Sequence, residues 1–148
     1  MMANSLIKQI VDEQLASLLR ADVDAWVDWW HKDGVFEFPF APPGYPKVVK
    51  GKAAIADYMA GLPEKIHLER FDIVELHENR AGDGGVVEFT CTGTVVSTGR
   101  PYNQHYVAIL KTKEGKLSLY RDFWNPLVAI EAFGSAGAFE DAFAGGEE

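Results

Sequence analysis

The sequence predicts an α+β fold in which helices precede a sheet of antiparallel strands. Apolar residues recur at helical spacing from about residue 5 to residue 20, which indicates an amphipathic helix. Later in the chain, strand-like segments alternate with turns that contain glycine, over about 66–76, 85–97, 102–111 and 117–124. Helices followed by a run of strands is the α+β pattern, with the helices packed on one face of a curved sheet.

Composition and charge narrow the class of protein. The chain has 148 residues, of which 47% are hydrophobic, 12% aromatic and 24% charged, so we expect one soluble globular domain. The net charge is −8 and there is no Lys/Arg cluster, which argues against nucleic acid and anionic membranes as partners. No apolar run approaches the ~20 residues of a membrane span. The N-terminus lacks the features of a signal peptide, so we expect a cytoplasmic protein.

Caps and breakers place the other elements. Asp22 is suited to cap a second helix, which contains three tryptophans and runs to about His31, where Gly34 stops it. A strand over 35–40, an irregular loop and a third helix over about 53–60 follow.

The end of the chain divides into two parts. A short helix over about 126–133 completes a predicted single domain, residues 1–134. Residues 135–148 are small, acidic and rich in glycine, and are predicted to form a flexible tail.

The stretch 117–126 contains the residue on which a functional interpretation depends. It is rich in aromatics and ends at a proline, so it reads as a strand whose period-two geometry places four side chains on one face: Ser118, Tyr120, Asp122 and Trp124. A carboxylate between a tyrosine and a tryptophan on a covered strand is costly to bury charged, and burial would raise its pKa. The alternative is an ordinary ion pair with Lys116 or with Arg121, although Arg121 points to the opposite face.

The order of several short motifs resembles the cone-shaped α+β superfamily of nuclear transport factor two, the ketosteroid isomerases and the SnoaL-type polyketide cyclases. These motifs are Ala21-Asp22, Phe36-Glu37-Phe38-Pro39, Gly51-Lys52-Ala53-Ala54-Ile55, Glu114-Gly115-Lys116-Leu117 and Tyr120-Arg121-Asp122-Phe123. The segment 101–134 is most similar to the phenazine-biosynthesis A/B proteins. The resemblance implies a cystatin-like curved sheet that forms, with the N-terminal helices, a cone around an apolar pocket. It also implies a homodimer through the outer face of the sheet.

The ketosteroid isomerase residues do not carry over. Those enzymes place a carboxylate base directly before the proline of the first strand, where this sequence has Phe38. Their oxyanion-hole tyrosine and carboxylic acid fall on Gln14 and Val107. Because all three parts are missing, we expect no steroid isomerisation by that mechanism. The same alignment implies that Val107, Trp124 and, with them, His105 face the pocket.

Two turns are compatible with the strand pairing near His105. A two-residue turn at Glu114-Gly115 sets Val107 opposite Asp122 and makes His105 a diagonal neighbour of Asp122. A three-residue turn sets Tyr106 opposite Asp122 and turns His105 outward. The resemblance favours the inward His105.

The functional residues of the phenazine-biosynthesis proteins match this sequence better. Their acid/base glutamate falls on Asp122, and the histidine of their third helix falls on Tyr58, a hydrogen-bond donor and not a base at neutral pH. The resemblance therefore implies catalytic roles for Asp122, His105 and Tyr58, and pocket walls that bind substrate: Tyr120, Trp124, Trp29, Val107 and Phe38.

Two functional hypotheses follow. The first is an enzyme that uses no cofactor and in which Asp122 moves a proton on a small hydrophobic cyclic substrate, during isomerisation, cyclisation, dehydration or condensation. The second is a non-catalytic module that binds a small molecule or assembles as a dimer. The sequence shows no glycine-rich phosphate loop, no metal-ligand spacing and no Ser-His-Asp order, so we expect neither a cofactor nor a metal.

Overall fold

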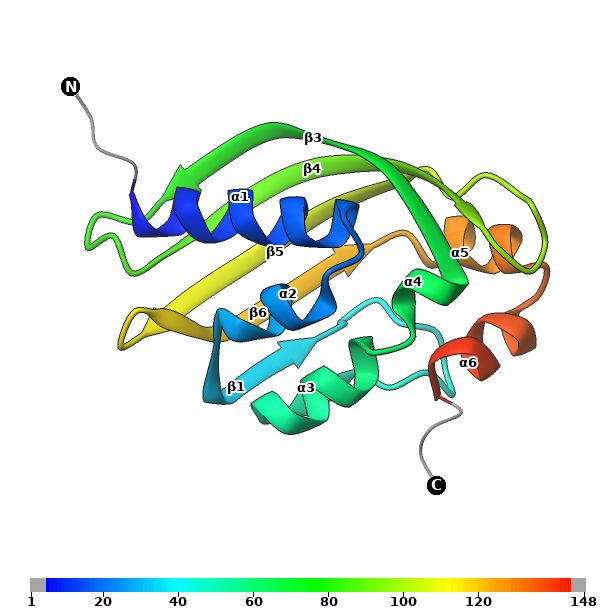
Figure 1. The fold of residues 1–148 in the computed structure, drawn as a ribbon, viewed down its shortest axis with the longest axis horizontal. Helices are drawn as coiled ribbons and strands as arrows, with labels where there is room; N and C mark the ends of the chain where they lie inside the picture. The colour runs from blue at the N-terminus through cyan, green and yellow to red at the C-terminus, as the bar shows by residue number, and fades with distance from the viewer. Residues whose placement is uncertain (1–4, 145–148) are drawn as a thin grey trace.

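A computed structural model describes residues 5–144 and confirms the α+β class (Figure 1). The elements are α1 Leu6–Leu19, α2 Val23–Asp28, β1 Trp30–Glu37, β2 Val48–Lys50, α3 Lys52–Met59, α4 Leu62–Lys65, β3 Ile66–Glu78, β4 Gly84–Val95, β5 Gln104–Lys113, β6 Lys116–Trp124, α5 Pro126–Phe133 and α6 Ala136–Ala144. The strand order in the sheet is β2-β1-β6-β5-β4-β3. The strands β3 to β6 form consecutive antiparallel hairpins, whereas β1 pairs with β6 in parallel. Figure 1 shows a curved sheet with α1 and α2 lying across one face.

Capping side chains set four helix starts, at Ser5, Asp22, Asn125 and Ser135. Ser5 Oγ accepts a hydrogen bond from Lys8 N at 3.0 Å and begins α1, close to residue 5, where the helical periodicity of the sequence starts. Asn125 Oδ1 accepts from Leu127 N at 2.9 Å at the start of α5, directly after β6 ends. The chain therefore turns sharply at the point where the strand that carries Asp122 stops.

The predicted tryptophan helix is wrong in its second half. Helix α2 ends at Asp28, and Trp30 is the first residue of β1, where it pairs with Leu117. Leu117 N donates to Trp29 O at 2.8 Å, so pairing with β6 overrides local helix propensity here. Gly34 does not stop a helix. The Trp30 ring packs directly on it, and a Cβ at Gly34 would lie 2.4 Å from that ring.

A β-bulge in β6 decides which side chains face the concave side of the sheet. Glu114 and Gly115 both have positive φ, 55° and 77°, and form the two-residue turn. Next to the turn Thr112 pairs with Leu117, but Lys111 pairs with Leu119, so Ser118 is an extra residue in β6. Beyond the bulge, Asp122 lies opposite Ala108 and Trp124 lies opposite Tyr106. Neither register that the sequence allowed is the observed one.

A helix stands where the sequence predicted a flexible end. Helix α6 spans Ala136–Ala144, and its Phe139 is 2% exposed. The Phe139 ring stacks on Tyr45 at 4.6 Å between centroids and meets Trp124 edge-on at 5.6 Å. Alone, α6 is too short to be stable in water, so it depends on the burial of this ring for its stability. The last four residues, 145–148, lie outside the described part of the chain.

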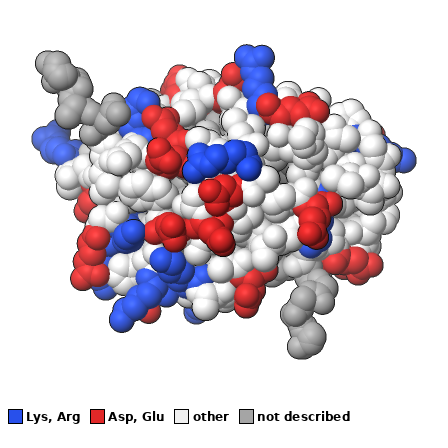
Figure 2. All heavy atoms as spheres, in the orientation of Figure 1, with Lys and Arg blue, Asp and Glu red and all other residues white. Residues whose placement is uncertain are grey.

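Charged side chains of both signs are interspersed on the face shown in Figure 2. Across residues 5–144, none of the helices combines the length and the apolar character that crossing a bilayer requires.

Candidate functional site

The concave face of the sheet and the helices line a partly open cavity of about 100 Å³. Its walls come from α1, α2, β1, α3, α4, α6, the strands β3 to β6 and the loop between β1 and β2. Most of the lining side chains are aromatic, and the rest are aliphatic with one exception. That exception is Asp122, the only carboxyl group among the described residues that line the cavity.

Asp122 has an environment that disfavours its charged form. Its side chain is 9% exposed, and Tyr120 and Trp124 lie beside it on the same face of β6. Oδ1 is fully buried and has no hydrogen-bond partner among the described residues. Burial raises the pKa of Asp122 from 3.8 to about 8. At neutral pH the group is therefore mostly a neutral acid, and it titrates close to the pH range of a cell.

Two tyrosine pairs share the cavity with Asp122. The hydroxyl groups of Tyr45 and Tyr58 are hydrogen-bonded to each other, and those of Tyr102 and Tyr106 are 3.4 Å apart. Burial raises the pKa of Tyr102 to about 12 and raises the pKa of Tyr58 further above its usual range. All four hydroxyl groups are therefore protonated at neutral pH. Within a pair, one hydroxyl donates to the other, which leaves the second proton for a ligand.

Comparison with known proteins identifies the family. The model of the SnoaL-like domain family matches residues 11–120 of this chain. The chain belongs to the SnoaL-like family. Two curated relatives align with most of the chain. The Bacillus subtilis protein YesE is 43% identical over 82% of this chain and 83% of its own length. The PhzA/B-like protein PA3332 of Pseudomonas aeruginosa is 37% identical over 88% of this chain and 92% of its own.

Several solved structures share the fold. A crystal structure of an isomerase candidate from Bacillus subtilis superposes with a TM-score of 0.82 and 41% identity, covering 85% of this chain and 91% of that one. The Mycobacterium tuberculosis protein RV0760c, solved with estradiol-17β-hemisuccinate, has a TM-score of 0.72 and 16% identity. It covers 82% of this chain and 95% of that one, and at this identity the likeness concerns the fold alone.

Five of the sequence-predicted site residues line the cavity of this SnoaL-like protein. Asp122 is joined there by four aromatic residues: Tyr58, Tyr120, Trp124 and Phe38. Trp29 is not among the lining residues. It is the C-cap of α2, and the Lys116 ammonium lies over its ring, 5.7 Å from the centroid. Trp26, one turn earlier, lines the cavity instead.

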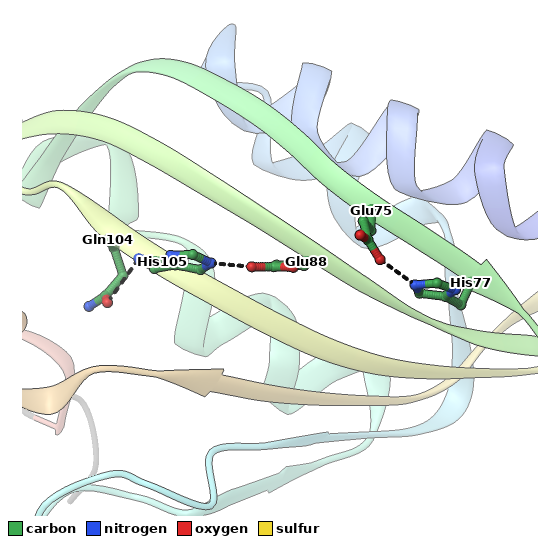
Figure 3. A network of polar contacts seen from close by, with 5 residues as sticks. All are labelled: Glu75, His77, Glu88, Gln104 and His105. Carbon is green, nitrogen blue, oxygen red and sulfur yellow. Dashed lines mark hydrogen bonds and ion pairs between the residues drawn. The ribbon is translucent and has the colours of Figure 1, made fainter.

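His105 and Val107 face away from the cavity, contrary to the favoured prediction, although the alternative three-residue turn also placed His105 outward. The His105 side chain is 59% exposed, and its Nε2 lies 2.6 Å from Glu88 Oε2 on the outer face of the sheet (Figure 3). Val107 is 37% exposed on the same face. The cause is the extra residue in β6, because a shift of one residue moves every side chain of the facing strand to the other side.

Sequence reasoning missed Tyr45 and Tyr106 as cavity residues. Tyr106 was recoverable, because His105 and Val107 share a strand face with Lys111, and a lysine near the end of the strand indicates the solvent side. Tyr45 lies in the irregular loop between β1 and β2, where no periodicity predicts the direction of a side chain. Its position depends on contacts with distant segments, above all the stacked Phe139.

The described residues, 5–144, include no group of three or more His, Cys, Asp or Glu side chains that could hold a metal ion. Cys91 is buried and burial raises the pKa of its thiol, so at neutral pH it is a buried thiol and not an activated nucleophile.

Proposed function

We propose that the protein is an acid/base enzyme that needs no cofactor and acts on a small, hydrophobic, cyclic substrate. Asp122 transfers the proton, during an isomerisation, cyclisation, dehydration or condensation. One observation carries the proposal: a carboxyl group lies in an aromatic cavity with Oδ1 unpartnered and with a pKa of about 8. A carboxyl group held in this way is costly for folding, and groups with such shifted pKa values are concentrated at functional sites.

The Tyr45–Tyr58 pair supplies the hydrogen-bond donor that such a proton transfer needs. Removing a proton next to a carbonyl group places negative charge on the carbonyl oxygen. A hydroxyl donor in an apolar cavity stabilises that charge more strongly than it would in water. Tyr58 and Tyr45 both line the cavity with Asp122, and the Asp122 charge contributes to the raised pKa of each. We therefore assign Tyr58, positioned by Tyr45, as the donor to the substrate oxygen.

The comparisons support the class of reaction and of ligand. The isomerase candidate from Bacillus subtilis is 41% identical over most of both chains. Among structures that share only the fold, RV0760c was solved with a steroid ester, and another is a designed binder of the steroid 17-OHP. A substrate built from hydrophobic rings fits these neighbours and the aromatic lining of the cavity.

The proposal is tested by deuterium exchange at carbon. We expect the protein in D2O to catalyse exchange next to the carbonyl group of at least one neutral cyclic ketone among cyclohexanone, 1-indanone and 2-tetralone, followed by NMR. Asp122→Asn should abolish this exchange, because the amide cannot accept the proton. The matched control is His105→Ala, which removes an imidazole on the outer face and should leave the rate unchanged.

The outcome also separates the two functional hypotheses. If a ketone raises the midpoint of thermal unfolding, and so binds, but shows no exchange, the protein is a binding module and the catalytic proposal fails. Exchange that survives in Asp122→Asn would contradict the role of Asp122 while leaving an enzyme in place.

We also propose that the outer face of the sheet pairs with a second copy of the chain. The exposed apolar side chains Val86 and Val107 lie on this face, on the neighbouring strands β4 and β5. Sedimentation at micromolar concentration should give twice the mass of one chain. Val107→Arg should give single chains, because it replaces a small apolar side chain in the contact with a long charged one. Leu127→Arg, at an exposed position on α5, should not. A wild-type monomer would refute the pairing.

A further inference from the structure

The lining of the cavity suits hydrophobic rings, but its volume is smaller than that of most ring systems. Its volume is about 100 Å³, whereas pockets that hold drug-sized ligands measure roughly 300–1,000 Å³. An engineered cavity of ~150 Å³ holds a single benzene ring. A cyclic ligand that is held entirely inside this cavity therefore needs one of its walls to move.

Helix α6 is one of these walls. Phe139 and Phe143 line the cavity from one side, one helical turn apart. The Phe143 ring lies 5.8 Å from the Tyr58 ring, and Phe139 stacks on Tyr45. The two rings therefore occupy space directly beside the tyrosine pair.

Helix α6 is held by fewer hydrogen bonds than the strands that form the other side of the cavity. The strands are joined by backbone hydrogen bonds, but no hydrogen bond or ion pair joins 136–143 to the rest of the described chain beyond the cap at Ser135. The contacts of α6 are aromatic packing and the Lys65 ammonium over the Phe143 ring, 5.4 Å from its centroid. The helix also follows Gly134, whose φ of 101° is readily available only to glycine.

We infer that Phe139 and Phe143 set the size of ligand that the cavity accepts, and that α6 moves outward when larger ring systems bind. This inference deepens the proposed function, on which its assignment of a substrate class rests. The movement costs aromatic contacts but no hydrogen bonds, because the helix keeps its own cap at Ser135. Phe139 packs on Tyr45 and Phe143 packs on Tyr58. A ligand that displaces these rings therefore also repositions the hydroxyl group that we propose donates a hydrogen bond to the substrate oxygen.

The test compares two fluorescent ring systems of different size, 2-naphthol and 1-hydroxypyrene. We expect the wild type to bind 2-naphthol more tightly. Phe143→Ala should improve the affinity for 1-hydroxypyrene about tenfold more than that for 2-naphthol, because it removes a ring from the movable wall. Leu127→Ala, which removes a side chain that is 72% exposed on α5, is the matched control and should change neither affinity.

A second variant, with a larger side chain at the same position, shows whether the change in affinity comes only from an effect on folding. Phe143→Trp enlarges the wall and should weaken 1-hydroxypyrene binding relative to 2-naphthol. Phe143 is only partly buried, so both substitutions are milder than a change at Phe139. Equal changes for the two probes, or none, in both variants would overturn the inference.

Binding to Asp122→Asn separates this inference from the proposed function. If the size preference and its response to Phe143→Ala persist there while no ketone is exchanged by the wild type, the proposed reaction fails and the role of α6 stands. If the wild type exchanges ketones but the Phe143 variants leave the size preference unchanged, the role of α6 fails alone.

Discussion

Asp122→Asn is expected to raise the free energy of unfolding by roughly 4 kcal/mol at pH 7, since one pKa unit corresponds to about 1.4 kcal/mol. In the folded chain, burial raises the pKa of Asp122 from 3.8 to about 8. Folding at pH 7 therefore requires the carboxylate of the unfolded chain to take up a proton. Asparagine resembles the neutral acid in shape and removes this requirement.

The difference in the free energy of unfolding between Asp122→Asn and the wild type should grow as the pH rises. Well below pH 3.8 the Asp122 carboxyl is neutral in both the folded and the unfolded chain. Ionisation then takes no stability from the wild type, so its free energy of unfolding should be closest to that of Asp122→Asn. As the pH rises toward 8, the unfolded chain ionises and the folded chain does not, so the wild type loses stability. Above about 8 both states are ionised and the difference is constant.

Urea unfolding of both proteins between pH 4 and pH 9 measures this difference. Asp57→Asn, which alters an exposed carboxyl group on α3, is the matched control and should change the free energy of unfolding little. A difference between wild type and Asp122→Asn that stays flat with pH would contradict the raised pKa of Asp122.

The rate of ketone exchange should rise with pH and level off near pH 8. Asp122 must be ionised to accept a proton, and the ionised fraction increases about tenfold per pH unit below the pKa of about 8. At its plateau the wild type should exceed Asp122→Asn by about 10²–10⁴-fold, the usual contribution of a positioned acid or base.

Initial rates between pH 5 and pH 9.5, corrected for the uncatalysed reaction, test this expectation. A rate that falls through pH 8 would mean that the neutral acid is the active form and that Asp122 donates the proton first. If the pH dependence of the rate shows no transition near pH 8, the protonation state of Asp122 does not control catalysis.

The sequence was sufficient for the order of the longer elements up to α5, although it missed β2 and α4, and for the side chains that share a face with Asp122. The strand β6 alternates regularly from Tyr120 to Trp124, and this local pattern alone sets which side chains share a face. The start of α1 at Ser5 was equally local, because a capping side chain and helical periodicity coincide there.

What the sequence could not supply depends on contacts between distant segments. The extra residue Ser118 lies in β6, yet it reverses the facing of His105 and Val107 on the neighbouring strand. Trp30 leaves the helix pattern because it pairs with Leu117, more than eighty residues later. The same holds for the residues of α6, whose aromatic side chains find partners only in the folded chain.

The parallel pairing of β1 with β6 also limits the order in which the chain can fold. A chain still being synthesised, or cut before Lys116, contains β1 but not the strand that completes its hydrogen bonds. Phe36 on β1 then lacks Tyr120, the aromatic neighbour that β6 brings to it. Closing such a long loop is slow. The chamber that holds Asp122 therefore belongs to the last stage of folding, and a nascent chain exposes its aromatic surface until that stage.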